Sequence, residues 1–185
     1  MIEEINSSEI EPPYYLNRED KLKWLMRTYG NDVIRVAYTY LKQKQLAEDV
    51  AQDVFIECYE KMDTFRNDSS YKTWIIKITV NRCKDVLKSW SLKNLLFTNY
   101  FENKNADSSL ERNMCREEAN QILSQQIMEL PVKLREVIIL FYYQEFTIAE
   151  ISVLLKVKPN TIKTRLHRAR LNLKKLLEGV SSING

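Results

Sequence analysis

The sequence is poor in the residues that make tight turns, with three glycines and four prolines among its 185 residues. Positive-φ turns favour glycine and proline interrupts helices, so the scarcity of both favours long helices. The same scarcity excludes the glycine-rich loops with which P-loop and dinucleotide-binding proteins hold phosphate. We therefore expect an all-α protein that uses no nucleotide cofactor.

Residues that bind metals or act in catalysis are also scarce. His167 is the single histidine, and the three cysteines are an odd number without a Cys-x-x-Cys pair. This inventory supports neither a catalytic triad, nor a multi-histidine metal site, nor a disulfide framework. We expect no enzyme activity, no metal, no cofactor and no small-molecule substrate, and we interpret the cysteines as structural thiols of a reduced, intracellular chain.

Long apolar runs are missing as well. The longest extends from Val137 to Tyr143, far short of the roughly 20 residues that span a bilayer. The first residues are acidic and contain no apolar stretch of the kind found in signal peptides. The sequence therefore predicts a soluble protein of the cytoplasm.

The net charge is only +3, but the charges are segregated along the chain. Residues 46–63 contain six acids and one base, whereas residues 66–90 contain six bases and two acids. Residues 151–177 contain eight lysines and arginines and no acid. One acidic segment and two basic ones indicate a protein partner and a polyanion contacted at two places.

Apolar residues recur at helical spacing in two groups of segments. The first group covers 18–44, 46–62 and 71–90, and the second extends from Glu118 to about Leu177, with Pro131 near a helix start. Between them, residues 91–117 lose the period and are rich in asparagine and serine. We expect two small helical domains, 18–92 and 118–178, joined by a flexible linker at 93–117, with tails at 1–17 and 179–185.

A helix-turn-helix is predicted near the C-terminus. Thr147 precedes Glu150 by three residues, which is a capping-box start, and Pro159 suits the first position of a second helix. One face of this second helix is apolar, with Ile162, Leu166, Ala169 and Leu173. Its other faces carry the side chains with which helices read the major groove: Asn160, Thr161, Lys163, Thr164, Arg165, His167 and Arg168. A solvated basic helix is the alternative, although such a helix usually carries both signs of charge.

The predicted helix after Tyr71 has a basic face that includes an aromatic residue and an amide. This face contains Trp74, Lys77, Ile78, Asn81, Lys84 and Lys88, and the polar loop 66–71 precedes it. Aromatic side chains among bases, beside a hydrogen-bonding loop, are typical of single-stranded DNA binding, because unpaired bases stack and can be read on their edges. Packing of Trp74 against a neighbouring helix is the alternative, and it leaves the charged face intact.

The acidic segment predicts an interface with another protein. Opposite its apolar face, an isoleucine and a tyrosine lie among polar and acidic residues: Asp49, Gln52, Ile56, Tyr59, Glu60 and Asp63. A hydrophobic anchor inside a charged rim is the usual anatomy of a protein interface, and the acids imply a basic partner. Packing of Ile56 against the helix at 18–44 is the alternative.

Together these segments resemble the extracytoplasmic-function (ECF) class of bacterial RNA polymerase sigma factors. The resemblance depends on Ala47 to Phe55, Thr73-Trp74-Ile75 with Asn81 and Asp85 to Lys88, Leu130-Pro131 with Arg135-Glu136-Val137, and Glu150-Ile151 with Asn160 to Arg170. The chain departs from the usual pattern at Ser152, where alanine is common, and at Lys156, where the turn often has glycine. A left-handed conformation at Lys156 would cost about 1 kcal/mol.

The resemblance implies a separate function for each of the two domains. The first domain would bind core RNA polymerase and melt the minus-10 promoter element, and the last would bind polymerase and read the minus-35 element as double-stranded DNA. The implied core-binding residues are Asp49, Gln52, Asp53 and Ile56. The implied minus-10 residues are Arg66, Asn67, Asp68, Ser69, Ser70, Tyr71, Lys77, Asn81 and Lys84. The implied minus-35 residues are Lys158, Asn160, Thr161, Lys163, Thr164, Arg165 and Arg168.

The resemblance also implies a regulon and an antagonist. Such factors direct transcription of stress-response genes, and an anti-sigma factor, often anchored in the membrane, holds them inactive. The aperiodic segment 91–117 has 27 residues, and a flexible chain of this length has a root-mean-square span of roughly 26–31 Å. We therefore expect the free protein to sample many interdomain arrangements unless an antagonist packs it shut, and core polymerase to fix the spacing.

Two other classes of function require sequence features that this chain lacks. A free-standing dimeric regulator needs a self-complementary apolar surface or a ligand pocket in its first domain, whereas this domain has separate acidic and basic faces. A nucleic-acid enzyme needs a carboxylate cluster with metal-binding spacing beside a basic groove. Binding to core polymerase is the observation that would distinguish these classes.

Overall fold

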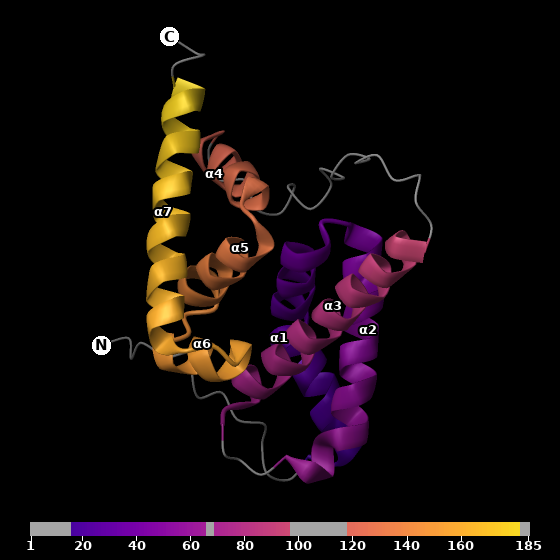
Figure 1. Ribbon diagram of the computed structural model, residues 1–185. Helices are drawn as coiled ribbons and strands as arrows, with labels where there is room; N and C mark the ends of the chain where they lie inside the picture. The colour runs from indigo at the N-terminus through magenta and orange to yellow at the C-terminus, as the bar shows by residue number, and fades with distance from the viewer. Residues whose placement is uncertain (1–15, 66–68, 97–117, 182–185) are drawn as a thin grey trace, which may run out of the picture.

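The computed structural model describes residues 16–65, 69–96 and 118–181, and every element within these ranges is helical (Figure 1). The first group of helices, here the N-terminal unit, comprises α1 (Arg18–Leu41), α2 (Lys44–Lys61), the 3-10 turn η1 (Met62–Thr64) and α3 (Tyr71–Leu96). The second, the C-terminal unit, comprises α4 (Glu118–Glu129), α5 (Val132–Ile138), the π-helical turn η3 (Ile139–Tyr143), α6 (Ile148–Leu155) and α7 (Pro159–Ser181). The prediction of an all-α protein built from two small helical groups is confirmed.

Helix ends in the N-terminal unit follow from local capping. The Asn17 side chain accepts a hydrogen bond from the Asp20 amide at 2.9 Å and so caps the start of α1. Lys42 adopts a left-handed conformation, with φ of 56°, and its amide bonds back to the Tyr38 carbonyl. This ends α1 at Leu41 rather than at the predicted residue 44. At the other end of the unit, α3 continues to Leu96, past residue 92, the predicted end of the first domain.

The helix-turn-helix of the C-terminal unit forms as its capping residues predict. Thr147 and Glu150 make the reciprocal hydrogen bonds of a capping box at the start of α6. Lys156 ends α6 in the left-handed conformation, with φ of 56°, and is exposed. The Ser152 hydroxyl donates to the Val157 carbonyl at 2.7 Å, and this bond supports the turn where the sequence lacks glycine and alanine. The departures from the family pattern therefore leave the motif intact.

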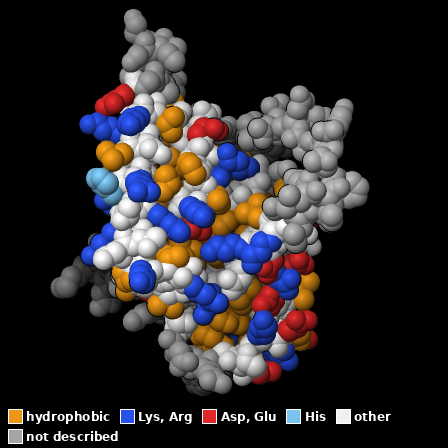
Figure 2. All heavy atoms as spheres, viewed as in Figure 1, with side chains coloured by type: hydrophobic (Ala, Val, Ile, Leu, Met, Phe, Trp, Pro, Cys, Tyr) orange, Lys and Arg blue, Asp and Glu red, His pale blue; other side chains and the backbone are white. Residues whose placement is uncertain are grey.

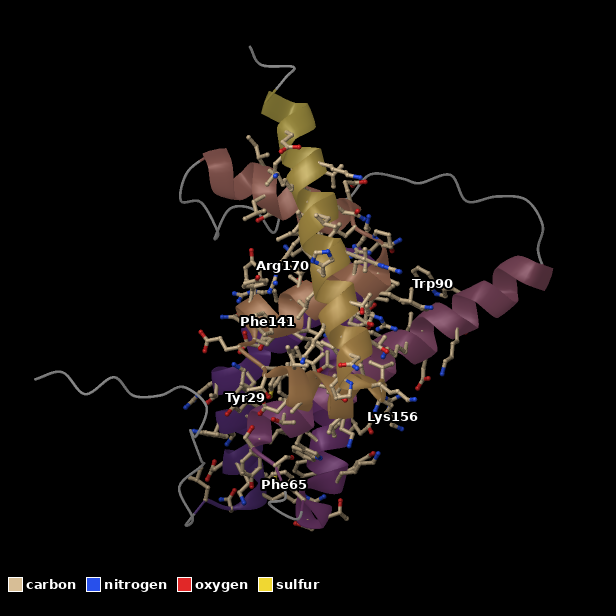
Figure 3. The ribbon with its side chains drawn as sticks, turned by 60° about the vertical axis from the view of Figure 1, so that its left-hand side comes forward. Tyr29, Phe65, Trp90, Phe141, Lys156 and Arg170 are labelled. Carbon is tan, nitrogen blue, oxygen red and sulfur yellow. The ribbon has the colours of Figure 1, made fainter. Side chains whose placement is uncertain are left out.

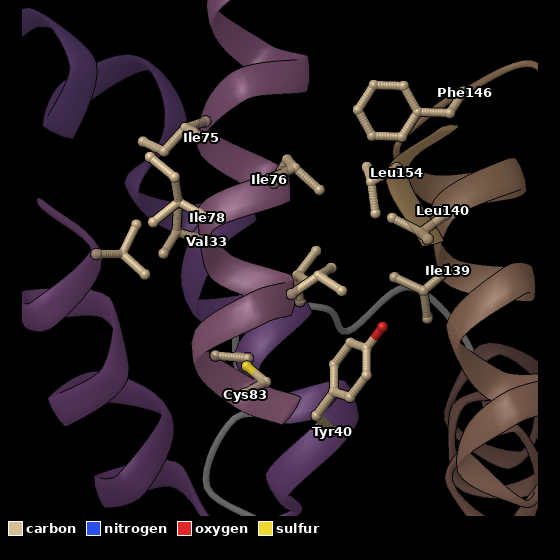
Figure 4. Close-up of a cluster of buried hydrophobic side chains, with 14 of the residues drawn as sticks. Val33, Tyr40, Ile75, Ile76, Ile78, Cys83, Ile139, Leu140, Phe146 and Leu154 are labelled. Carbon is tan, nitrogen blue, oxygen red and sulfur yellow. The ribbon is translucent and has the colours of Figure 1, made fainter. Parts of the chain in front are cut away.

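The two units pack against each other. Helices α1 and α3 contact α5 and α6, and in the buried cluster between them Ile76 and Tyr40 lie opposite Ile139, Leu140 and Leu154 (Figure 4). Residues 97–117, most of the predicted linker, lie outside the described ranges. In this closed arrangement both units present buried apolar and hydrogen-bonding side chains to each other, and the sampling of other arrangements stays a prediction.

Glu57 on α2 forms an ion pair with Arg82 that joins α2 to α3, and a second ion pair with Lys61 on its own helix. Glu57 accepts from Lys61 Nζ at 2.6 Å and from Arg82 Nε at 2.8 Å, and its side chain is largely shielded from solvent. Burial alone would raise the pKa of Glu57, but the hydrogen bonds from Lys61 and Arg82 outweigh it and hold this pKa below its ordinary value of 4.5. The charged form of Glu57 therefore stabilises the packing of α2 on α3.

Replacing Glu57 with Gln should lower the free energy of unfolding by about 1 kcal/mol at pH 7. Because the folded pKa is depressed, this contribution is present above the unfolded pKa and is lost as the pH falls through the folded value. Urea denaturation at a series of pH values should show wild type and variant converging at acid pH. Asp85→Asn, which removes an exposed carboxylate paired with Lys88, is the matched control and should change stability by less than about 0.5 kcal/mol. A difference of equal size at every pH would contradict this account of Glu57.

Candidate nucleic-acid and protein interfaces

Helix α7 presents a polar, basic face and buries the opposite stripe. Ile162, Leu166 and Ala169 are fully buried against α5 and α6, and Leu173 packs at the edge, which confirms the predicted stripe. The candidate DNA-reading side chains that are exposed are Lys158, Asn160, Lys163, Thr164 and Arg168, and Thr161 is half-buried. The stripe therefore fixes α7 in the unit and directs these side chains to solvent.

Basic and acidic side chains lie on different parts of the surface. Figure 2 shows lysines and arginines along α7 and across the middle of the molecule, and acids gathered over α2. Arg170 belongs to another face of α7, where its guanidinium donates to the Tyr142 hydroxyl and stacks near Phe141 (Figure 3). The surface therefore offers an anionic and a cationic partner separate places to bind.

Arg165 differs from the other candidates on α7. Its guanidinium pairs with Glu136 on α5 at 2.9 Å, and its side chain is 19% exposed. Lys84, a candidate on α3, lies 3.8 Å from the same carboxylate. In this arrangement two side chains that the resemblance assigns to DNA pair with a buried carboxylate, and of the two Lys84 is 34% exposed.

The start of α3 combines a cap with an aromatic cluster. The Ser70 hydroxyl accepts from the Thr73 amide at 3.1 Å, so Ser70 caps the helix, and Ser69 beside it is exposed. Tyr71 lies with its ring centroid 4.3 Å from that of Phe65 and 6.0 Å from that of Trp24. Of the candidate loop, Arg66, Asn67 and Asp68 lie outside the described residues. The cluster fixes the start of α3, directly after the candidate loop.

Two side chains of the predicted basic face of α3 are packed rather than displayed. Trp74 joins the same cluster, 5.0 Å from Phe65, and is half-buried, so it packs within the protein, although its ring partners are not on a neighbouring helix. The placement of Ile78 on the basic face is wrong, because this residue is 7% exposed. Helix α3 contacts α1, α2 and α6 and therefore buries a wider face than its periodicity indicates. Lys77 and Asn81 remain exposed, as predicted.

Helix α2 displays the candidate protein-binding patch. Asp49, Gln52, Asp53 and Ile56 are all exposed, and Ile56 is 58% exposed despite its apolar side chain. Packing of Ile56 against α1 is therefore excluded. Tyr59 was expected beside it, but this tyrosine is half-buried beneath the Arg18 guanidinium, which lies 4.4 Å from its ring. The patch thus has one apolar anchor.

The described cysteines are structural. Cys58 and Cys83 are free and buried, and burial raises the pKa of each thiol to about 12, so neither is a nucleophile at neutral pH. Cys115 lies outside the described residues. Within those residues no cluster of three or more potential metal ligands occurs, and no helix has the length and apolar character needed to cross a membrane.

Comparisons with known proteins match both units. The model of Sigma-70 region 2 matches residues 25–91, on α1 to α3, and that of Sigma-70 region 4 matches residues 120–173, on α4 to α7. The chain is 30% identical to the ECF RNA polymerase sigma factor SigW of Bacillus subtilis over 169 residues, which are 86% of this chain and 90% of the relative. It is 32% identical to the ECF RNA polymerase sigma-E factor of Escherichia coli over 131 residues, 66% of this chain and 69% of the relative.

Solved structures share the fold. The sigma factor RpoE in complex with the anti-sigma factor NepR, from Bartonella quintana, has a TM-score of 0.73 at 21% identity and covers 86% of this chain and 98% of that one. CnrH in complex with the cytosolic domain of CnrY has a TM-score of 0.61 at 20% identity, covering 87% and 90%. At these identities the likeness concerns the fold alone.

Proposed function

The chain belongs to the ECF class of RNA polymerase sigma factors, which act in promoter-specific transcription initiation and are not enzymes, and from this premise we propose a separate binding function for each of its exposed surfaces. The patch on α2 docks on core RNA polymerase, α3 and its preceding loop contact the minus-10 element, and α7 reads the minus-35 element. The observation that carries this proposal is the separation of charge. An acidic helix with one exposed isoleucine lies in one unit, and an exposed helical face without acids lies in the other.

Core binding by α2 is supported by the spacing of the exposed side chains. Asp49, Gln52, Asp53 and Ile56 recur every three or four residues and therefore share one face of the helix. Exposing Ile56 to water is unfavourable, and a partner surface that covers it recovers this free energy. The acids around Ile56 select a basic surface and speed the encounter.

Minus-35 recognition by α7 is supported by its exposed polar residues. The first turns of the helix carry Asn160, Thr164 and Arg168, with Lys158 and Lys163 beside them, and this is where recognition helices contact base edges. Asparagine suits adenine, arginine suits guanine, and the lysines suit phosphate. Thr161 and Arg165 complete the set that we assign to the minus-35 element.

Minus-10 recognition and melting are assigned to α3 and the loop before it. Lys77 and Asn81 are exposed on α3 and suit a phosphate and a base edge. Ser69, Ser70 and Tyr71 lie at the base of the loop, where the cluster of Trp24, Phe65 and Trp74 makes a firm support for Tyr71. A firm support lowers the entropy cost of holding unstacked bases. The assignment extends to Arg66, Asn67, Asp68 and Lys84.

We assign the chain to a stress-response regulon and to control by an anti-sigma factor. The solved sigma factor with the highest likeness given above was crystallised with its anti-sigma factor, which supports an antagonist of the same kind here. A factor that serves RNA polymerase works in the cytoplasm, and a membrane-anchored antagonist would hold it at the membrane. Run-off transcription with purified core polymerase on genomic fragments tests the function as a whole. Core polymerase alone and core with this chain should give different transcripts, and identical transcripts would overturn the proposal.

Replacing Ile56 with Arg should weaken binding to core polymerase at least about tenfold, because it removes the apolar anchor and places a cation inside the acidic rim. Fluorescence titration of the labelled chain with core polymerase measures the affinity. Met26→Arg is the matched control, because Met26 is also an exposed apolar residue, 48% exposed, on α1. Circular dichroism should show both variants folded. Normal binding of Ile56→Arg would show that core polymerase docks elsewhere.

Replacing Arg168 with Ala in the holoenzyme should cost about 1–3 kcal/mol on the preferred promoter and relax the preference at one base pair of the minus-35 element. If Arg168 contacts phosphate instead, every sequence should be weakened alike. Competition binding across single-base promoter variants separates the two results. Arg170→Ala removes the same charge from the face that stacks on Tyr142 and serves as the control. Equal affinities of wild type and Arg168→Ala for every variant would exclude Arg168 from the interface.

A further inference from the structure

A buried carboxylate lies at the junction of the two units. Glu136 on α5 is 4% exposed, accepts hydrogen bonds from two other helices and forms an ion pair with a third. The Tyr40 hydroxyl of α1 donates to Oε2 at 2.7 Å, Arg165 Nη1 of α7 donates to Oε1 at 2.9 Å, and Lys84 Nζ of α3 lies 3.8 Å from Oε2. Two of these three partners, Tyr40 and Lys84, belong to the opposite unit.

A second polar contact also joins the two units. Gln144, 1% exposed, donates from Nε2 to Asp32 Oδ1 on α1 at 3.1 Å. Nearby, Lys72 Nζ of α3 lies 5.8 Å from the centre of the Phe146 ring. The buried side chains of Ile76, Ile139 and Leu140 also lie in this junction (Figure 4). The junction is therefore packed and hydrogen-bonded like the inside of a domain.

Glu136 has its full set of partners only when the units are together. A carboxylate removed from water needs charged or hydrogen-bonding partners, and Arg165 supplies only some of them from within the C-terminal unit. Burial, followed by the charge of Glu136, raises the pKa of Tyr40 well above its ordinary value, so its hydroxyl keeps its proton and remains a donor at neutral pH. Separating the units removes the Tyr40 and Lys84 partners from Glu136.

We propose that the free chain is held closed by this clasp of Glu136 with Tyr40, Lys84 and Arg165, and that the closed form withholds Lys84 and Arg165 from DNA. The DNA part rests on the proposed function, which assigns these two side chains to the minus-10 and minus-35 elements. In the closed form their charges neutralise Glu136, so a phosphate or base edge must compete with this carboxylate for them. DNA then binds the free chain weakly, because only the open fraction of molecules offers both cations. Polymerase favours the open form when it binds the two units at separate places.

Tyr40→Phe tests the clasp, because it removes one hydroxyl and keeps the ring, and Tyr40 is not assigned to DNA or to polymerase. Small-angle X-ray scattering of the free variant should show a larger radius of gyration than wild type. Binding to a labelled duplex oligonucleotide of random sequence should strengthen roughly tenfold, as expected for the loss of one hydrogen bond to a charged group. The salt dependence of this binding should also steepen, because more cations then contact phosphate.

Tyr142→Phe is the matched control, since it removes a hydroxyl that accepts from Arg170 within the C-terminal unit. It should leave scattering and DNA binding unchanged. Asp32→Asn loosens the second contact and should expand the chain in the same direction, so the test does not depend on one variant. Scattering and affinity of Tyr40→Phe and Asp32→Asn equal to those of Tyr142→Phe would overturn the clasp. Failure of the chain to alter run-off transcription would overturn the proposed function instead and would leave the scattering result standing.

Discussion

The arrangement of the two units depends on how the charge of Glu136 is compensated away from water. An ionised carboxylate in a protein interior is costly unless cations and hydrogen-bond donors surround it. Here those groups come from α1, α3 and α7, so the pairing orients three helices around α5. The apolar cluster beside it supplies most of the favourable free energy, and the polar contacts fix which faces meet. A substitution at this carboxylate should therefore alter side-chain contacts in both units.

The exposed surfaces of α2 and α7 differ from the junction, because their side chains do not pack against the rest of the protein and remain available to partners. On α2 the exposed isoleucine among acids suits a basic protein surface, and on α7 the exposed face without acids suits DNA. Each DNA contact alone is small and sensitive to salt. Linking two such contacts raises affinity only when their spacing matches the two promoter elements. In the proposed function, polymerase sets this spacing by binding the two units at separate places.

Local chemistry explains which features were predictable from the sequence. The capping box at Thr147, the helix start at Pro159 and the buried stripe beginning at Ile162 depend on neighbouring residues only, and the structure confirms them. The exposure of Ile56 follows from helical spacing in the same way. Helix periodicity describes one buried face, however, and α3 packs against three helices, so the prediction for Ile78 was wrong. The bond from Tyr40 to Glu136 joins residues 96 positions apart, and no local pattern indicates it. For this reason the sequence could not show that Lys84 and Arg165 share a carboxylate.

The central claim is that this chain reads both promoter elements only after the closed junction has opened on polymerase. Footprinting of one promoter, found by run-off transcription, tests it directly when the free chain and the holoenzyme are compared at about physiological salt. The account predicts protection of both the minus-10 and the minus-35 elements by the holoenzyme and of neither by the free chain at the same concentration. Full protection of both elements by the free chain would contradict it and would favour a regulator that binds DNA without polymerase.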